Sequence, residues 1–215
     1  MFILYMLFGY LLGSIPFALV IGKVFYHTDV RNYGSGNLGG TNAGRVLGKK
    51  AGIAVIVLDA LKCVLAIYLV SLFDKQASIW CGLAVCIGHC YPVFAHFKGG
   101  KAAASMFGFL FAVSLFTVNN FLCFLIPFLC FMICLYFSKM VSLSSMVASL
   151  TSTLCLIFFK AETSVIIASL LMAVLIIYRH QGNIKKILNG TENKASFFNV
   201  FQEIQNRSAP HSENH

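Results

Sequence analysis

The sequence has little charge and few of the polar residues that keep a domain in water. Charged residues make up 11% of its 215 residues, whereas hydrophobic residues make up 59%, and the mean hydropathy is +0.82. These values exclude an ordinary soluble domain and indicate an integral membrane protein. Because backbone N–H and C=O groups must be paired within a bilayer-spanning segment, the long apolar runs are predicted to be helices.

Several motifs that mark other chemistries are also missing. The eight cysteines form no C-x-x-C pair and fall within or at the ends of apolar runs, where packing is expected rather than metal or redox chemistry. Gly48-Lys49 and Gly100-Lys101 are not followed by Ser or Thr, which excludes a Walker A loop. The first apolar run lacks a basic start and a cleavage site, so it is predicted to be a retained span. No metal and no cofactor are expected.

Seven apolar runs are predicted to be membrane spans. Gly13, Ser14 and Pro16 interrupt the first run, where they predict a kink and a close contact with a neighbouring helix. Asn119-Asn120 divides the longest run into two short spans. The predicted fold is therefore an all-α integral membrane bundle of about seven transmembrane helices. The runs cover residues 3–25, 51–73, 77–95, the two halves of 102–137, 141–159 and 163–178.

Positive charge is concentrated on one side of this bundle. The loops after the first, third, fifth and seventh runs contain most of the 16 lysines and arginines, whereas the opposite side keeps only Lys75 and Lys160, each beside an acid. The positive-inside rule then places the N-terminus outside and the C-terminus in the cytoplasm. No nucleic acid partner is expected, because the chain has no soluble basic domain and no basic stripe interleaved with aromatics.

Residues 34–45 form a glycine-dense polar loop that ends in Arg45. Gly34, Gly36 and Gly39 match G-x-G-x-x-G, but no strand precedes them and no βαβ unit encloses them, so a dinucleotide site is not predicted. Such a loop can still point several backbone N–H groups at an anion, and a guanidinium suits phosphate or carboxylate. Taken alone, the segment is equally explained as a solvated loop with positive-inside charge.

Three further polar motifs are predicted on the same face. Residues 88–101 again combine glycines with cations, and Lys101 is the better phosphate ligand among them. Residues 142–145 open the sixth span, where serines ordinarily act as helix caps. Residues 178–192 alone would be a basic juxtamembrane segment. Because separate loops share one chemistry on one face, a common anion site is favoured.

Three ionisable residues lie inside the predicted spans. Asp59 and Lys62, three residues apart in the second span, are predicted to neutralise each other in a structural role. His89, in the third span, is either a functional group or a neutral histidine that bonds to a helix carbonyl.

Six short motifs occur in a fixed order within residues 5–194, and together they closely resemble the bacterial acyl-phosphate:glycerol-3-phosphate acyltransferase family of integral membrane enzymes. They are Gly13-Ser14-Ile15-Pro16, Gly34-Ser35-Gly36-Asn37 through Thr41-Asn42 to Arg45, Gly88-His89 through Pro92, Phe97-Lys98-Gly99-Gly100-Lys101, Val141-Ser142-Leu143, and Arg179-His180 with Asn183-Ile184 and Gly190-Thr191-Glu192.

The resemblance implies transfer of a fatty acyl group from acyl phosphate to the 1-hydroxyl of sn-glycerol 3-phosphate. The products would be 1-acyl-glycerol 3-phosphate (lysophosphatidic acid) and phosphate, in the first step of phospholipid synthesis. The implied partners are these two substrates and membrane lipid, in the bacterial cytoplasmic (inner) membrane with the active site on the cytoplasmic face. Three positions depart from the family pattern: Gly40 replaces the usual alanine, and Ala102 and Ser105 replace the common glycine and threonine.

The expected roles follow from the two phosphates, since like charges about 4 Å apart repel by roughly 4 kcal/mol near a protein surface. Arg45 and Lys101 are assigned to the phosphates, and His180 and Asn183 to the glycerol end and the reacting hydroxyl. The chain lacks an H-x-x-x-x-D motif, so either His180 or the acyl phosphate's own oxygen takes the proton, and we favour the substrate. The expected catalytic residues are Ser35, Arg45, Lys101, Ser142, His180 and Asn183, and the expected substrate-binding residues are Gly34, Gly36, Asn37, Thr41, Asn42, Gly99 and Gly100.

A transporter or flippase for a phosphorylated lipid or metabolite is the alternative function. It predicts polar groups near mid-membrane and on both faces, together with an internal repeat, and the sequence shows neither pattern. We expect one transmembrane acyltransferase domain over residues 1–195 and a polar cytoplasmic tail over residues 196–215. Apolar residues at helical spacing in the tail predict either a short interfacial helix or a loosely ordered terminus.

Overall fold

The computed structural model describes residues 1–195, and this part of the chain contains helices and no strand, which confirms the all-α class. The expected tail over residues 196–215 lies outside the described residues. The elements are α1 (Phe2–Gly13), α2 (Phe17–Tyr26), η1 (Val30–Asn32), α3 (Gly40–Leu47), α4 (Lys49–Ser71), α5 (Lys75–Cys90), η2 (Val93–Ala95), α6 (Ala103–Phe116), α7 (Leu122–Ser138), α8 (Val141–Phe158), α9 (Thr163–Arg179) and α10 (Gln181–Leu188).

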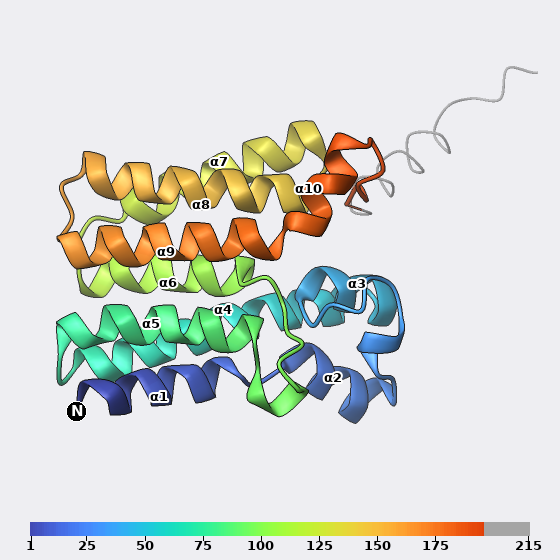
Figure 1. The fold of residues 1–215 in the computed structure, drawn as a ribbon, viewed down its shortest axis with the longest axis horizontal. Helices are drawn as coiled ribbons and strands as arrows, with labels where there is room; N and C mark the ends of the chain where they lie inside the picture. Colours follow the sequence, from blue (N-terminus) through green and yellow to red (C-terminus); the bar gives the residue numbers. More distant parts are fainter. Residues whose placement is uncertain (196–215) are drawn as a thin grey trace, which may run out of the picture.

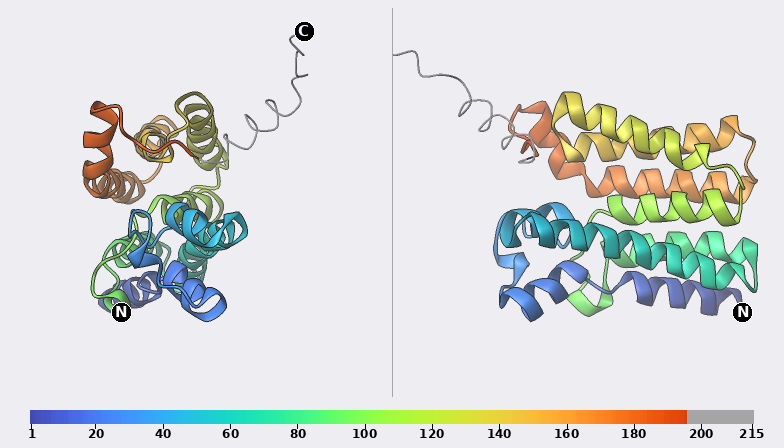
Figure 2. Two further views of the ribbon diagram at one scale, coloured as in Figure 1. Left: turned by 90° about the vertical axis from the view of Figure 1, so that its right-hand side faces the viewer. Right: turned by 180° about the vertical axis from the view of Figure 1, so that it is seen from behind.

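The long helices lie side by side in one bundle and alternate in direction along the chain (Figure 1). In one half α1 packs on α5, and α4 packs on both α5 and α6; in the other half α7 and α9 pack on α8. Contacts of α9 with α5 and α6 join the two halves, as the end-on and rear views also show (Figure 2). The polar connections therefore alternate between the two ends of the bundle.

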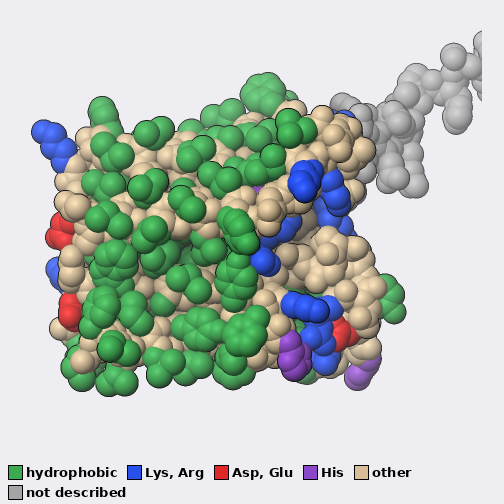
Figure 3. Space-filling view, viewed as in Figure 1, with side chains coloured by type: hydrophobic (Ala, Val, Ile, Leu, Met, Phe, Trp, Pro, Cys, Tyr) green, Lys and Arg blue, Asp and Glu red, His purple; other side chains and the backbone are tan. Residues whose placement is uncertain are grey.

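The short helices α2, α3 and α10 gather at one end of the bundle, on the right in Figure 1. Lysine and arginine side chains also gather at this end, whereas the opposite end shows few charges (Figure 3). Between the two ends the surface carries many exposed large apolar side chains, which suits contact with lipid. The site-bearing end is thus the polar, basic end of an apolar bundle.

The seven predicted apolar runs are all helical, but they differ in length. Four segments within residues 1–195 are long and apolar enough to cross a membrane: Phe2–Tyr26, Lys49–Ser71, Lys75–Ala95 and Val141–Phe158. A fifth would result if α9 and α10, which are bent by 58° at their junction, formed one span, while α6 and α7 are shorter apolar helices. A membrane protein with several spanning helices is supported, and the count of seven spans and their orientation stay predictions.

The predicted interruption of the first run is confirmed. Helix α1 ends at Gly13, α2 begins at Phe17, and the Ser14 hydroxyl donates a hydrogen bond to the Tyr10 carbonyl at 2.8 Å. A Cβ atom on Gly13 would overlap the backbone of Val85 on α5. Small residues let two helix backbones touch in this way inside a membrane. The contact brings the break in the first run against α5, close to the polar end.

The segment predicted as one loop over residues 34–45 is only partly a loop, because helix α3 begins at Gly40. Its sequence, rich in glycine and polar residues, has low helix propensity, so periodicity gives no signal there. Packing stabilises it instead: a Cβ atom on Gly52 of α4 would lie 2.6 Å from the Cα atom of Gly44. Arg45 therefore stands on a helix that is packed against α4, rather than on a flexible loop.

Candidate active site

A cavity of about 500 Å³ at the polar end of the bundle brings together the side chains proposed for catalysis. Its walls come from helices α3 to α10 and from the connections between them. The expected residues that line it are Ser35, Asn37, Thr41, Asn42, Arg45, Lys101, Ser142, His180 and Asn183. The four expected glycines, Gly34, Gly36, Gly99 and Gly100, do not line the cavity, and they lie in the two loops that support it.

Asn42 holds the first of these loops together. Its side-chain amide donates to the carbonyls of Val30 at 3.0 Å and Tyr33 at 3.3 Å, and its oxygen accepts from the Ser35 amide at 2.8 Å. Gly34 has a positive φ of 61°, and a Cβ atom there would overlap the Asn42 oxygen. Because its amide is already occupied by backbone partners, Asn42 fixes the position of Ser35 more directly than it can donate to a ligand.

Asn37 joins the first loop to the second. Its oxygen accepts from the Gly39 amide at 2.9 Å just before α3, and its amide donates to the Gly99 carbonyl at 3.4 Å. Arg179 holds the same second loop from the other side, since it donates to the carbonyls of Gly99 at 3.3 Å and Gly100 at 3.2 Å. The guanidinium also lies 4.9 Å from the centre of the Tyr91 ring. Residues from three separate motifs thus fix one loop.

Lys101 begins a chain of side-chain hydrogen bonds across the cavity. Its ammonium donates to the Asn183 oxygen, and the Asn183 amide donates to the Glu192 carboxylate at 2.6 Å. The Ser142 hydroxyl donates to the same Glu192 oxygen at 2.7 Å. Burial lowers the pKa of Lys101, the nearby Glu192 carboxylate opposes that shift, and Arg179 adds to it. The four polar groups are therefore held in a fixed arrangement before any ligand arrives.

Glu192 accepts hydrogen bonds at the centre of these polar groups, although the sequence did not predict it as a catalytic or binding residue. The sequence marks it only as part of the motif Gly190-Thr191-Glu192, because its partners are distant in sequence. The structure places it against Ser142 and Asn183, with its second oxygen buried and without a partner among the described residues. Its position beside Lys101 and Asn183 makes it a positioning residue for both.

Four cations line the cavity: Arg45, Lys101, Arg179 and Lys186. Arg179 is engaged with loop carbonyls and Lys101 with Asn183. Arg45 is exposed and makes no hydrogen bond or ion pair within residues 1–195, so its planar fork is available to an anionic ligand. By contrast, Arg31, which lies shortly before residues 34–45 in the sequence, is held by Asp29 through hydrogen bonds of 2.6 and 2.9 Å. The cations converge as a phosphate-binding site requires.

His180 follows the last residue of α9 and is buried at the cavity wall. Its Nδ1–H donates to the Ile176 carbonyl at 2.8 Å, because a carbonyl can only accept, so Nε2 is the ring's free acceptor. The pKa of His180 is lowered from 6.5 to about 4, mainly by burial and in part by the cations Lys101 and Arg179, while the bond to Ile176 opposes the shift. The ring is therefore neutral at pH 7 and is a weaker base than an ordinary histidine.

The protonation of His180 can be measured directly. Since its pKa is lowered, the ring in the ligand-free protein should stay neutral as the pH falls through 6.5 and should take up its proton only near pH 4. An NMR titration of ¹⁵N-histidine-labelled protein, with the His180→Gln variant to assign the signal, measures this midpoint. A midpoint near 6.5 would contradict the burial described above.

The cavity becomes apolar away from the cations. Phe107 on α6 and three phenylalanines of α7, Phe124, Phe128 and Phe131, line this part. The Phe107 ring packs edge to face on Phe131 and Phe128, with centroids 5.2 and 5.7 Å away, and Phe124 stacks on Phe128. One cavity therefore offers a cationic end and a hydrocarbon-like end, which suits a ligand with a charged head and an apolar chain.

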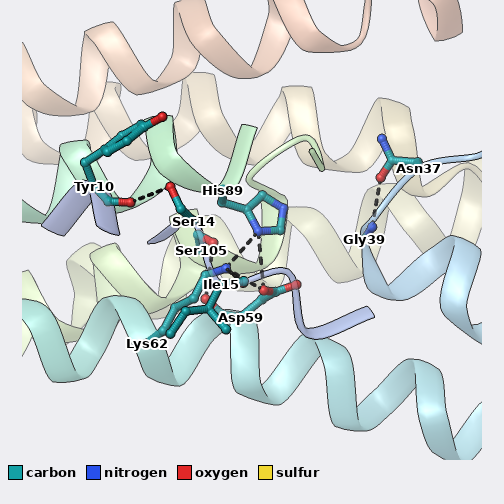
Figure 4. A network of polar contacts seen from close by, with 9 residues as sticks. All are labelled: Tyr10, Ser14, Ile15, Asn37, Gly39, Asp59, Lys62, His89 and Ser105. Carbon is teal, nitrogen blue, oxygen red and sulfur yellow. Dashed lines mark hydrogen bonds and ion pairs between the residues drawn. The ribbon is translucent and has the colours of Figure 1, made fainter. Parts of the chain in front are cut away.

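Asp59 and Lys62 form the predicted pair, with the Lys62 ammonium 2.8 Å from an Asp59 oxygen and both side chains buried. The Nδ1 atom of His89 joins them, at 3.2 Å from Lys62 and 3.3 Å from Asp59 (Figure 4). Asp59 and His89 also line the cavity. The sequence left two interpretations of His89 open. The structure does not show a bond from its ring to a helix carbonyl, because the ring contacts this ion pair instead.

The family model and the relatives that match this sequence all describe the same enzyme, and each match covers most of the chain. A family model described as glycerol-3-phosphate acyltransferase matches residues 3–190. Glycerol-3-phosphate acyltransferase 2 of Bacillus anthracis is 49% identical over 197 residues, which is 89% of this chain and 98% of that protein. Glycerol-3-phosphate acyltransferase of Macrococcus caseolyticus is 45% identical over 195 residues, covering 90% of this chain and 97% of that protein.

Two solved structures resemble the fold. Both are crystal structures of PlsY (YgiH), an integral membrane glycerol 3-phosphate acyltransferase. The glycerol 3-phosphate form has a TM-score of 0.85 and 37% identity, and the match covers 93% of this chain and 98% of that one. The lysophosphatidic acid form has a TM-score of 0.81 and 36% identity, with coverage of 90% and 94%.

Proposed function

The chain belongs to the glycerol-3-phosphate acyltransferase family, and we propose that its acyl donor is an acyl phosphate. On this proposal it acylates the 1-hydroxyl of sn-glycerol 3-phosphate and releases inorganic phosphate, as the first step of phospholipid synthesis. The forms of PlsY with glycerol 3-phosphate and with lysophosphatidic acid support the acceptor and the product.

The observation that supports an acyl phosphate as donor is the lining of this cavity. Its cationic end holds four basic side chains, more than one phosphate requires, and its other end is lined by phenylalanine. Two phosphates brought together repel each other, so a site for a phosphorylated acceptor and a phosphorylated donor needs several cations. We assign Arg45 and Lys101 to the phosphates and the phenylalanine-lined end to the acyl chain.

The polar side chains between these ends would orient the acceptor. Ser35, Thr41 and Ser142 offer hydroxyls at the cavity wall. Asn42 fixes the loop that carries Ser35, and Asn37 joins that loop to the second one. His180 would accept a hydrogen bond from the glycerol end of the acceptor through Nε2, beside Asn183. Gly34, Gly36, Gly99 and Gly100 contribute backbone shape to the same loops. These residues would raise the reaction rate by positioning the substrates, which brings the hydroxyl oxygen close to the acyl carbon.

The proton of the reacting hydroxyl is assigned to the phosphate of the acyl donor rather than to His180. The acceptor oxygen forms a bond to the acyl carbon, the bond between that carbon and the phosphate oxygen breaks, and the hydroxyl proton passes to the departing phosphate. A ring with a pKa of about 4 is a poor general base at neutral pH, which supports this route. A His180→Ala variant should therefore keep some turnover, and one that still binds both substrates with no turnover at all would contradict it.

Donor choice is tested with the protein purified in detergent. Three acyl donors are each supplied with glycerol 3-phosphate: acyl phosphate, acyl-CoA and the acyl thioester of acyl carrier protein. The product measured is 1-acyl-glycerol 3-phosphate. Product from acyl phosphate alone supports the proposal, whereas product from a thioester in its absence overturns it. Most of the exposed lysines and arginines gather at one end of the bundle, which does not favour the transporter.

We also propose seven spans, an outside N-terminus and a cavity that faces the cytoplasm of a bacterial inner membrane. The basic end of the bundle supports this orientation. In intact cells a membrane-impermeant thiol reagent should label a Gln76→Cys variant and leave a Ser35→Cys variant unlabelled. Both positions are exposed at opposite ends, so each serves as the control for the other. Labelling of Ser35→Cys from outside would reverse the orientation.

A further inference from the structure

His89 belongs to a buried network that the proposed mechanism does not use. The Lys62 ammonium has three N–H groups and three acceptors within reach: an Asp59 oxygen at 2.8 Å, the Ile15 carbonyl at 3.1 Å and the Nδ1 atom of His89 at 3.2 Å (Figure 4). The side chains of Lys62, Asp59 and His89 are 3%, 1% and 6% exposed. Each N–H of the ammonium is therefore satisfied only if Nδ1 of His89 accepts.

The charges favour the same arrangement. Lys62 and Asp59 neutralise each other, so a protonated His89 would leave a net positive charge buried within the bundle, which is costly. The other neutral tautomer would direct its Nδ1–H at the Asp59 oxygen, 3.3 Å away, and would leave one N–H of Lys62 without an acceptor. A neutral ring that accepts at Nδ1 carries its proton on Nε2. The Lys62–Asp59 pair thus makes His89 a donor on the opposite side of its ring.

The donor atom, Nε2, lies beneath the second loop, next to Gly100. His89 lines the cavity, and a Cβ atom on Gly100 would overlap Nε2, so the absence of a side chain at Gly100 leaves room for this nitrogen. No residue within 1–195 hydrogen-bonds to Nε2. Helix α6 leads away from this point, with Ala103 and then Phe107 lining the cavity. The donor therefore stands near the junction of the cationic end and the phenylalanine-lined end.

We propose that His89 is a catalytic residue whose Nε2–H donates a hydrogen bond to the carbonyl oxygen of the acyl donor. This inference rests on the proposed function. Arg45 and Lys101 are already assigned to the phosphates, whereas the carbonyl oxygen gains negative charge only as the new bond forms, and it lies where head and chain meet. A neutral, fixed donor stabilises such an oxygen mainly in the transition state. Lys62 and Asp59 are positioning residues that set the tautomer.

A matched pair of variants separates this role from a structural one. His89→Asn keeps an oxygen that can accept from Lys62 but loses the donor at the Nε2 position, whereas His89→Gln places an amide N–H near that position. With palmitoyl phosphate as donor, kcat of His89→Asn should fall about a hundredfold while KM for each substrate changes less than about threefold, and His89→Gln should recover part of the loss. Ser105→Ala, which removes only a bond to the Asp59 backbone carbonyl, should match the wild type.

The tautomer itself is measured without turnover. In ¹⁵N-histidine-labelled protein at neutral pH, the signal assigned to His89 should be that of a neutral ring with its proton on Nε2. A proton on Nδ1, or on both nitrogens, overturns the inference even if the variants do not fold. A wild-type protein that forms no product refutes the proposed function, whereas an active wild type with an equally active His89→Asn refutes only the role of His89.

Discussion

Replacing Arg45 with alanine is expected to lower kcat/KM for glycerol 3-phosphate at least about a hundredfold. Each hydrogen bond to a charged group is worth about 1.5–3 kcal/mol, so a bidentate contact with phosphate is worth about 3 kcal/mol or more, and 1.4 kcal/mol is tenfold. Arg45 is exposed at the cavity and has no hydrogen bond or ion pair among the described residues, so the variant loses ligand contacts without breaking a polar contact within the fold. Initial rates of product formation measure the loss.

Arg31→Ala is the control for this variant. It removes an arginine from the same polar segment, but one that is bound to Asp29 and does not line the cavity, so its kcat/KM should stay within about threefold of wild type. Arg45→Lys should recover little, because an ammonium cannot form the planar two-bond contact. Wild-type kinetics for Arg45→Ala would remove Arg45 from the phosphate site.

Replacing Glu192 with alanine is expected to lower kcat/KM by a similar factor and also to lower the melting temperature. The change removes the acceptor for Ser142 and Asn183 and takes a negative charge away from Lys101. Two hydrogen bonds to a carboxylate are worth about 3–6 kcal/mol together, a loss that is shared between folding and the transition state. Kinetic assays and thermal unfolding in the same detergent measure the two parts.

Glu162→Ala provides the comparison for Glu192. Glu162 is an exposed acid before α9, its side chain makes no capping bond, and it does not line the cavity. Its loss should change neither rate nor melting temperature appreciably. A Glu192→Ala variant that equals Glu162→Ala in both measurements would mean that the chain of bonds from Lys101 to Ser142 has no functional weight.

The fold was largely predictable because a membrane-spanning helix requires a long run of apolar residues, which is easily recognised in a sequence. Each long apolar run became a helix, and the break at Gly13 and Pro16 fell where these residues stand. Helix α3 was missed, since it is stabilised by the contact of Gly44 with Gly52 rather than by propensity or periodicity. A contact between glycines on two adjacent helices leaves no periodic pattern, so a sequence alone does not reveal it.

The site was predictable in membership more than in role. The loop motifs were expected to converge, and their cations and hydroxyls do line one cavity. Asn42 shows the limit, because its partners are backbone carbonyls that only the folded loop brings to it. Glu192 and Arg179 show the same limit, since each acts through residues more than eight positions away in sequence. Roles of this kind depend on tertiary neighbours.

The central claim is that a phosphorylated donor and glycerol 3-phosphate react directly in one cavity, with Arg45 as a principal cation. The most direct test incubates the purified protein with palmitoyl phosphate and glycerol 3-phosphate and measures acylated product and inorganic phosphate together. We predict equal amounts of the two products, and an equal fall of both in Arg45→Ala. No acylated product from the wild type, or phosphate release without acylation, would contradict the account.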